Sequence, residues 1–159
     1  MGTPPIENVD STSSSEGLGN WYANLIRIER RKCLLFTSEK TLYTFLIPSV
    51  LKANIKNLQS EFLNHLILNL KYEEFGLDII NHVREEYQEI GFAKTASKTV
   101  LGFMNEFAFI YEVEIQGVEG IRNLNLMEVN ARINRMPLHA SKRESFHPID
   151  VMRKTAVQV

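Results

Sequence analysis

Apolar residues recur at two different spacings along this chain, and the change of spacing separates a strand-forming part from a helix-forming part. Up to Ile47, three apolar runs, 21–28, 32–37 and 41–47, are joined by short polar stretches. Such runs with tight polar connections are typical of antiparallel strands. The pattern therefore predicts a three-stranded antiparallel meander that ends at Pro48.

The second run contains Leu34, Leu35 and Phe36 in succession. Because side chains alternate between the two faces of a strand, this run places apolar groups on both faces. Either a central strand covered on both sides or the wall of a barrel would explain it. Cys33, in the same run, is most simply a small buried hydrophobic residue.

After Pro48 the apolar residues recur at helical spacing. Besides a central helix considered next, helices are predicted at 55–70, 80–87, 124–134 and, as a turn or two, 149–156. The expected fold is α+β, with a short antiparallel β-meander (21–47) packed against a helical layer (52–135). Residues 19–159 are expected to form a single α+β domain.

The central helix follows a polar stretch that begins at Lys94, and either Thr95 or Ser97 is a suitable N-cap. One apolar stripe consists of Val100, Met104, Phe107, Tyr111 and Ile115. The opposite face holds Lys98, Gly102, Asn105, Glu106 and Phe109. Residues 107–115 also alternate as a half-buried strand would, but 104–108 fits only the helical period, so we favour a helix.

Two residues of this helix run against ordinary helix preferences. Lysine in a first turn, as Lys98 would be, is disfavoured by roughly 0.3–1 kcal/mol unless an anion joins it, because the helix N-terminus is positive. Gly102 costs about 1 kcal/mol relative to alanine, but it permits close approach of a ligand or partner. Such exceptions are expected at functional sites. The candidate residues for binding an anion or a partner are Lys94, Thr95, Ser97, Lys98, Gly102, Asn105 and Glu106.

The structural alternative for this stretch is that Gly102 packs beneath another segment of the same chain while both lysines are solvated. The two explanations differ in what surrounds the glycine.

Composition limits the picture further. The 159 residues, 44% hydrophobic and 23% charged, suit one globular domain. Residues 1–18 are rich in Ser and Thr, have little to bury, and are expected to form a disordered leader. With one cysteine and no run of about 18 apolar residues, we expect a cytoplasmic protein without a membrane partner.

Catalytic motifs are poorly represented. The histidines at 65, 82, 139 and 147 lack the spacing of paired metal ligands, and no glycine-rich phosphate loop follows a strand. We therefore expect no metal and no cofactor. Adjacent acids such as Glu73 and Glu74 suggest a solvated helix face. Secondary site candidates are Asn134 and, at a predicted hairpin tip, Arg30 and Arg31, which are more simply explained as surface charge.

Four blocks, 19–25, 35–42, 94–106 and 134–137, together resemble a family of bacterial proteins catalogued only as a domain of unknown function. The resemblance covers about residues 19–150. In its most specific block Lys98, Thr99, Phe103 and Glu106 stand where arginine, serine, serine and aspartate are expected. It implies a compact α+β domain and a short strand before residue 19 that this sequence does not obviously supply. It assigns no activity and leaves the function open.

Two functional hypotheses follow. The first is a non-enzymatic soluble binding module that uses the surface around the 94–106 helix start to hold a protein or an anionic ligand. The alternative is an enzyme or toxin-like protein acting on a phosphorylated or nucleic-acid substrate, with the lysines as anion clamps and Glu106 as general acid or base. The missing catalytic set favours the first, and nucleic acid is weakly supported.

Overall fold

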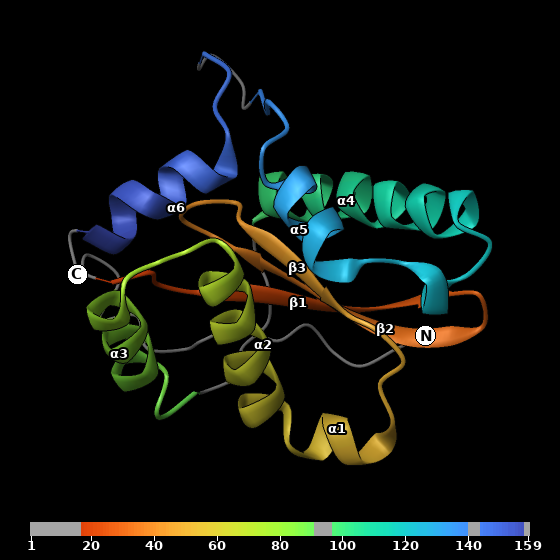
Figure 1. Ribbon diagram of the computed structural model, residues 1–159, viewed down its shortest axis with the longest axis horizontal. Helices are drawn as coiled ribbons and strands as arrows, with labels where there is room; N and C mark the ends of the chain where they lie inside the picture. Colours follow the sequence, from red (N-terminus) through yellow and green to blue (C-terminus); the bar gives the residue numbers. More distant parts are fainter. Residues whose placement is uncertain (1–16, 91–96, 140–143, 158–159) are drawn as a thin grey trace.

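The computed structural model describes residues 17–90, 97–139 and 144–157. Within them, three strands form one antiparallel sheet: β1 (Trp21–Ile28), β2 (Arg31–Ser38) and β3 (Thr44–Ile47), in that order (Figure 1). The helices are α1 (Lys52–Lys56), α2 (Leu58–Tyr72), α3 (Leu77–Glu86), α4 (Lys98–Gly117), α5 (Leu126–Ile133) and α6 (Pro148–Val157), with a short 3-10 helix, η2 (Ile121–Asn123). The α+β class is confirmed.

The β1–β2 connection is as short as a hairpin allows. Ile28 pairs with Arg31, so Glu29 and Arg30 alone form the turn, with φ values of 54° and 65°. Positive φ at both positions matches the right-handed twist of the flanking strands. β3 begins later than predicted because Leu42, with φ of 62°, bonds back to Ser38 in the preceding turn.

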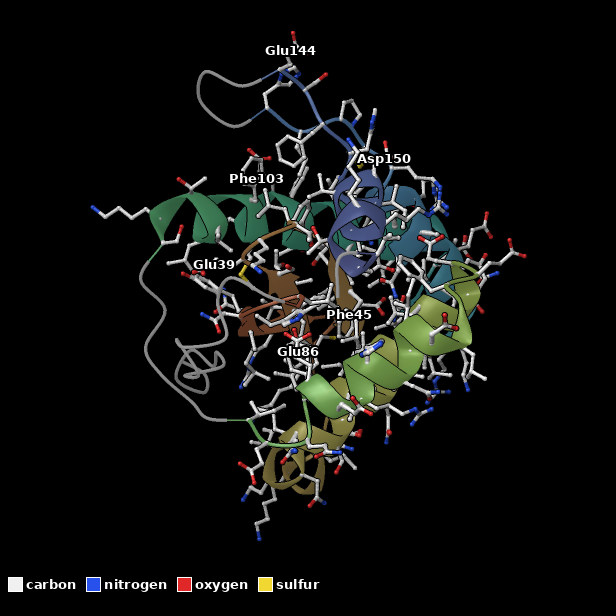
Figure 2. The ribbon with its side chains drawn as sticks, turned by 90° about the vertical axis from the view of Figure 1, so that its left-hand side faces the viewer. Glu39, Phe45, Glu86, Phe103, Glu144 and Asp150 are labelled. Atoms are coloured by element: carbon white, nitrogen blue, oxygen red, sulfur yellow. The ribbon has the colours of Figure 1, made fainter. Side chains whose placement is uncertain are left out.

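The helices that pack against the meander cover both faces of the sheet. Leu34 and Phe36 face a core completed by α2, α3 and α6, and Cys33 and Leu35 face a second core completed by α4 and α5. Figure 2 shows α4 on one side of the sheet and α2 and α3 on the other, with Phe45 between the sheet and α2. The covered central strand is therefore the correct alternative.

The helices follow the predicted periods more closely than the predicted bounds. The first predicted helix is divided at Asn57 into α1 and α2, and the last turns form the ten-residue α6. Residues 107–115 are helical, which settles the helix-or-strand question. The buried residues of α4 are the predicted Val100, Met104, Phe107, Tyr111 and Ile115.

The N-terminal boundary of the folded part lies earlier than predicted. Leu18 is fully buried, and the backbone N–H groups of Leu18 and Gly19 donate to the Glu86 carboxylate at 2.9 Å each. Gly17 and Leu18 thus belong to the fold rather than to a leader that ends at 18. The rest of that leader, and the strand expected there, lies outside the described residues.

None of the helices that the structure describes is long and apolar enough to cross a membrane.

Candidate functional site

The start of α4 is attached to the sheet by a chain of hydrogen bonds. Ser97 is the N-cap, and its hydroxyl accepts from the Val100 N–H at 3.3 Å. The Ser97 N–H donates to the Tyr22 hydroxyl at 2.9 Å, and that hydroxyl donates to Glu39 at 3.0 Å. Glu39 lies on the same side of the sheet as α4 (Figure 2). Ser97 therefore has a structural role: its hydroxyl caps α4, and its backbone N–H attaches the start of the helix to the sheet.

The other described candidates on α4 point away from the sheet. Lys98, Gly102, Asn105 and Glu106 are exposed, and Lys98 and Glu106 form no ion pair with any residue that the structure describes. A methyl group added at Gly102 would meet no atom within 4 Å. Gly102 thus does not pack beneath another described segment, contrary to the structural alternative. Lys94 and Thr95 lie outside the described residues.

Two large apolar side chains continue this exposed line toward the end of α4. Phe109 is 66% exposed and Val113 is 47% exposed. On a wheel of about 100° per residue, both lie within about 20° of Gly102. We call Lys98, Gly102, Asn105, Glu106, Phe109 and Val113 the α4 outer face. Val113 was not among the candidates from sequence.

The arginines of the hairpin do not join this face at its start. The neighbouring Glu29 accepts from the Ile121 N–H at 2.9 Å, which places the hairpin turn beside the chain that follows α4. Ser97 lies a 20-residue helix away, about 30 Å. Arg31 donates to the Ser49 hydroxyl at 3.1 Å, and Arg30 is exposed.

Asn134 has a structural position inside the fold. It is fully buried, its side-chain oxygen accepts from the Thr44 N–H, and its amide donates to the Thr44 carbonyl, both at 2.8 Å. One helical turn earlier, Asn130 accepts from the Leu46 N–H at 3.4 Å and donates to Asn69 at 3.0 Å. The two asparagines thus occupy the outer edge of β3.

A charged groove between α2, α5 and α6 was not predicted. Glu73 is only 6% exposed and accepts two hydrogen bonds from Arg135, at 2.7 and 2.9 Å, so its assignment to a solvated face was wrong. These hydrogen bonds raise the pKa of Arg135. The groove measures about 480 Å³ and is also lined by Glu74, Glu128, Arg132 and Arg153. The only signal in the sequence was Arg135, in the 134–137 block.

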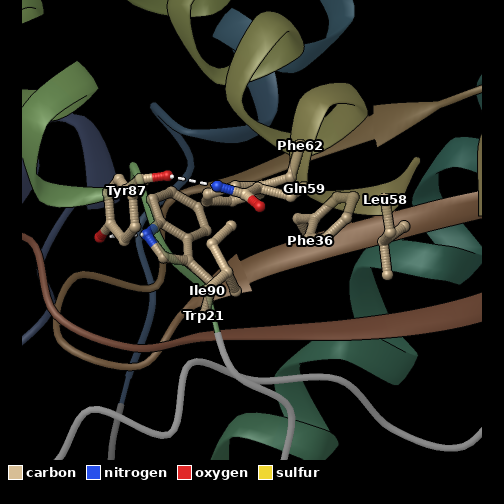
Figure 3. A pocket seen from close by; sticks show the side chains of 7 residues that line it. All are labelled: Trp21, Phe36, Leu58, Gln59, Phe62, Tyr87 and Ile90. Atoms are coloured by element: carbon tan, nitrogen blue, oxygen red, sulfur yellow. Dashed lines mark hydrogen bonds between the residues drawn. The ribbon is translucent and has the colours of Figure 1, made fainter. Parts of the chain in front are cut away.

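A smaller hollow lies beneath α2, where Figure 3 shows seven side chains around it. Its volume is about 20 Å³, room for about one water. Trp21 is 3% exposed, as expected for a core aromatic, and its indole N–H donates to the Tyr87 hydroxyl at 2.8 Å. Burial raises the pKa of Tyr87, so this hydroxyl stays protonated. The hollow is a packing gap rather than a ligand site.

Reactive groups are sparse in the described part of the chain. It contains no cluster of three His, Cys, Asp or Glu side chains that could hold a metal ion. Cys33 is fully buried, and burial raises the pKa of its thiol, which disfavours the reactive thiolate. Glu106, the candidate general acid or base, lies on an open helix face.

Comparison with known proteins gives a family and no function. No curated protein and no solved structure matches the chain significantly. A family model described as "Domain of unknown function (DUF6933)" matches residues 1–151, nearly the whole chain, in agreement with the resemblance seen in its blocks. The chain therefore belongs to the DUF6933 family.

Proposed function

We propose that this domain is a non-enzymatic interaction module that binds a protein partner through the α4 outer face. The observation that carries the proposal is the empty space beside Gly102, where an added methyl group would meet no described atom within 4 Å. A glycine in an exposed helix costs about 1 kcal/mol relative to alanine. Because no described part of the chain uses the space above it, that cost is best explained by a partner that approaches the helix backbone.

The partner that this face fits is a second copy of the chain. In an antiparallel pair of α4 helices centred between Asn105 and Glu106, Gly102 of one copy lies opposite Phe109 of the other. The aromatic ring then fills the space left by the missing side chain. Because the pair is two-fold symmetric, the same contact forms twice.

The polar residues of the α4 outer face are also complementary in this arrangement. Asn105 of one copy meets Glu106 of the other, so that the amide can donate to the carboxylate. The stem of Lys98 covers Val113, and its ammonium comes near the exposed Glu112. Opposite charges are thereby paired and the apolar side chains are removed from water.

The enzyme hypothesis has less support. Lys98, Asn105 and Glu106 lie on the exposed face of one helix, and none of them lines the groove or the small hollow described above. Asn134 would also have to belong to such a catalytic site, but it is buried against the edge of β3, where it bonds to Thr44. A catalytic site needs its groups to converge around a substrate.

Sedimentation equilibrium of the purified chain tests the proposal. One helix pair buries little area, so we expect weak association, with a dissociation constant on the order of 100 µM. Gly102→Gln should abolish it by filling the space above the backbone, and Phe109→Ser by removing the ring. The matched control is Leu68→Ser, at a 51% exposed position on α2, which should associate like the wild type.

A wild-type chain that stays monomeric at millimolar concentration would contradict the proposal. So would equal weakening by Leu68→Ser and Phe109→Ser, which would indicate non-specific apolar association.

A further inference from the structure

The short helix α1 has apolar side chains that neither core of the protein covers. Leu51, directly before the helix, is 71% exposed, and Ile55 is half-buried. The Ile55 N–H donates to the Leu51 carbonyl, so the two residues are one helical turn apart and lie on the same side. Neither side chain packs in or against a core, whereas the neighbouring Val50 and Leu58 are core residues. Leu51 and Ile55 thus form a short apolar line outside both cores.

Two lysines of α1 run beside this apolar line. Lys52 and Lys56 are also one turn apart and exposed, and neither forms an ion pair with a residue that the structure describes. Like charges four residues apart destabilise a helix. An apolar line bordered by cations is the pattern of a helix that lies in the interface of a membrane.

The adjacent strands bring two more cations to the same place. Arg27 of β1 and Lys32 of β2 are exposed cross-strand partners, an arrangement in which like charges repel. The next pair on their face of the sheet, Leu25 and Leu34, packs in the core that α2 completes. Figure 1 shows α1 on this same side of the sheet. The Val50 N–H donates to the Lys32 carbonyl at 2.8 Å, so the strand pair lies beside the start of α1.

Carboxylates are few around α1 and bind elsewhere. Residues 27–32 and 49–57 contain one acidic residue, Glu29, and six basic ones: Arg27, Arg30, Arg31, Lys32, Lys52 and Lys56. Glu29 accepts from the Ile121 N–H, and Ile121 packs against the core on the opposite face of the sheet. Glu61 of α2 accepts from an amide of α1 at 3.0 Å and forms no ion pair with a described residue. The surface around α1 is therefore positive in a chain whose net charge is −1.

We propose that this α1 surface, made of Arg27, Lys32, Leu51, Lys52, Ile55 and Lys56, binds a membrane surface rich in anionic lipids. Its apolar line enters the boundary between headgroups and acyl chains, and its four cations meet the anionic headgroups. The expectation of no membrane partner rested on the lack of a long apolar run, which concerns a spanning segment and not a helix lying on the surface. This binding does not depend on the α4 outer face.

Nucleic acid fits the α1 surface less well. Its phosphates would pair with the four cations but would leave Leu51 in water. Single strands are also held by bases stacked on aromatic rings, whereas the apolar line of α1 is aliphatic. An anionic bilayer uses both the cations and the apolar line.

Vesicle sedimentation of the full chain tests the proposal. The chain should bind vesicles with about a third phosphatidylserine at least about tenfold more tightly than vesicles of phosphatidylcholine alone. This binding should weaken as salt is raised, because salt screens the cations. No binding to the anionic vesicles, or equal binding to both kinds, would overturn the proposal. So would tighter binding of a single-stranded oligonucleotide at the same ionic strength, which would identify nucleic acid as the partner.

Charge variants locate the binding surface. Lys52→Gln combined with Lys56→Gln should weaken binding to the anionic vesicles about tenfold or more. Arg84→Gln combined with Lys154→Gln removes the same charge from exposed positions on α3 and α6 and should leave binding unchanged. Equal weakening by the two pairs would show that the attraction does not belong to α1, and the proposal would be wrong.

One apolar substitution separates insertion from attraction by charge alone. Leu51→Ser should weaken binding to the anionic vesicles about threefold or more, because the side chain then has nothing to bury among the lipids. Leu77→Ser, at a 68% exposed position at the start of α3, is the matched control and should bind like the wild type. If both variants bind like the wild type, the apolar line does not enter the membrane and the proposal fails.

Discussion

Asn130 of α5 and Asn134, the C-cap of that helix, form hydrogen bonds with the edge of β3 that a fourth strand would otherwise form. Asn130 and Asn134 are one turn apart on a helix, about 6 Å, close to the roughly 7 Å between Thr44 and Leu46 on the strand. Their amides therefore meet the edge groups of both residues. The sequence could not reveal this role, because it depends on which strand forms the edge of the sheet.

Replacing Asn134 with alanine should lower the free energy of unfolding by roughly 2–4 kcal/mol, because the Thr44 N–H and carbonyl both lose a buried partner. Urea denaturation measures the change. Asn105→Ala is the control, since Asn105 is exposed on α4 and its loss should stay within about 0.5 kcal/mol. Equal effects of the two changes would show that Asn134 is not needed at the strand edge.

At the scale of elements, α4 explains both the success and the ambiguity of the sequence prediction. Its buried stripe was predictable because it recurs every three or four residues. The competing strand pattern arose because Phe109 and Val113 are apolar on the opposite, exposed face. The ambiguity was thus itself a sign of an apolar outer face. The groove gave no comparable sign, because its side chains come from three separate helices.

Gly102→Ala should raise the free energy of unfolding by about 0.5–1 kcal/mol at concentrations where the chain is monomeric, because alanine favours the helix and its methyl group meets nothing. Thermal or urea unfolding at low micromolar concentration shows the change. A loss of stability instead would mean that Gly102 does pack against part of its own chain.

At the scale of the molecule, the sequence predicted the strands, most helices and the class, but not how the helices divide between the two faces. The consecutive apolar residues of β2 required cover on both sides. Which helix covers which face depends on the path between α3 and α4, and no local spacing determines that path. The candidate site was predicted as a helix face, while Asn134 and the hairpin arginines proved to lie elsewhere.

If the two cores on opposite faces of the sheet unfold as one unit, a destabilising substitution in one core should shift the unfolding midpoint measured in the other. Phe107→Ala, in the core completed by α4 and α5, should lower the free energy of unfolding by roughly 3–5 kcal/mol. The single tryptophan, Trp21, belongs to the opposite core, so its fluorescence should show the same shifted midpoint as the far-ultraviolet circular dichroism. An unshifted tryptophan transition would show that the two cores unfold separately.

The most direct test of the α4 outer face as a docking surface is site-specific cross-linking at its centre. Asn105→Cys places a thiol where the two copies approach each other most closely, and buried Cys33 adds little background. With a short bis-maleimide, this variant should form covalent dimers, and adding Gly102→Gln should prevent them. Leu68→Cys on α2, exposed but remote from α4, should stay monomeric. Cross-linking at residue 105 that is no faster than at residue 68, or that Gly102→Gln leaves unchanged, would contradict the account.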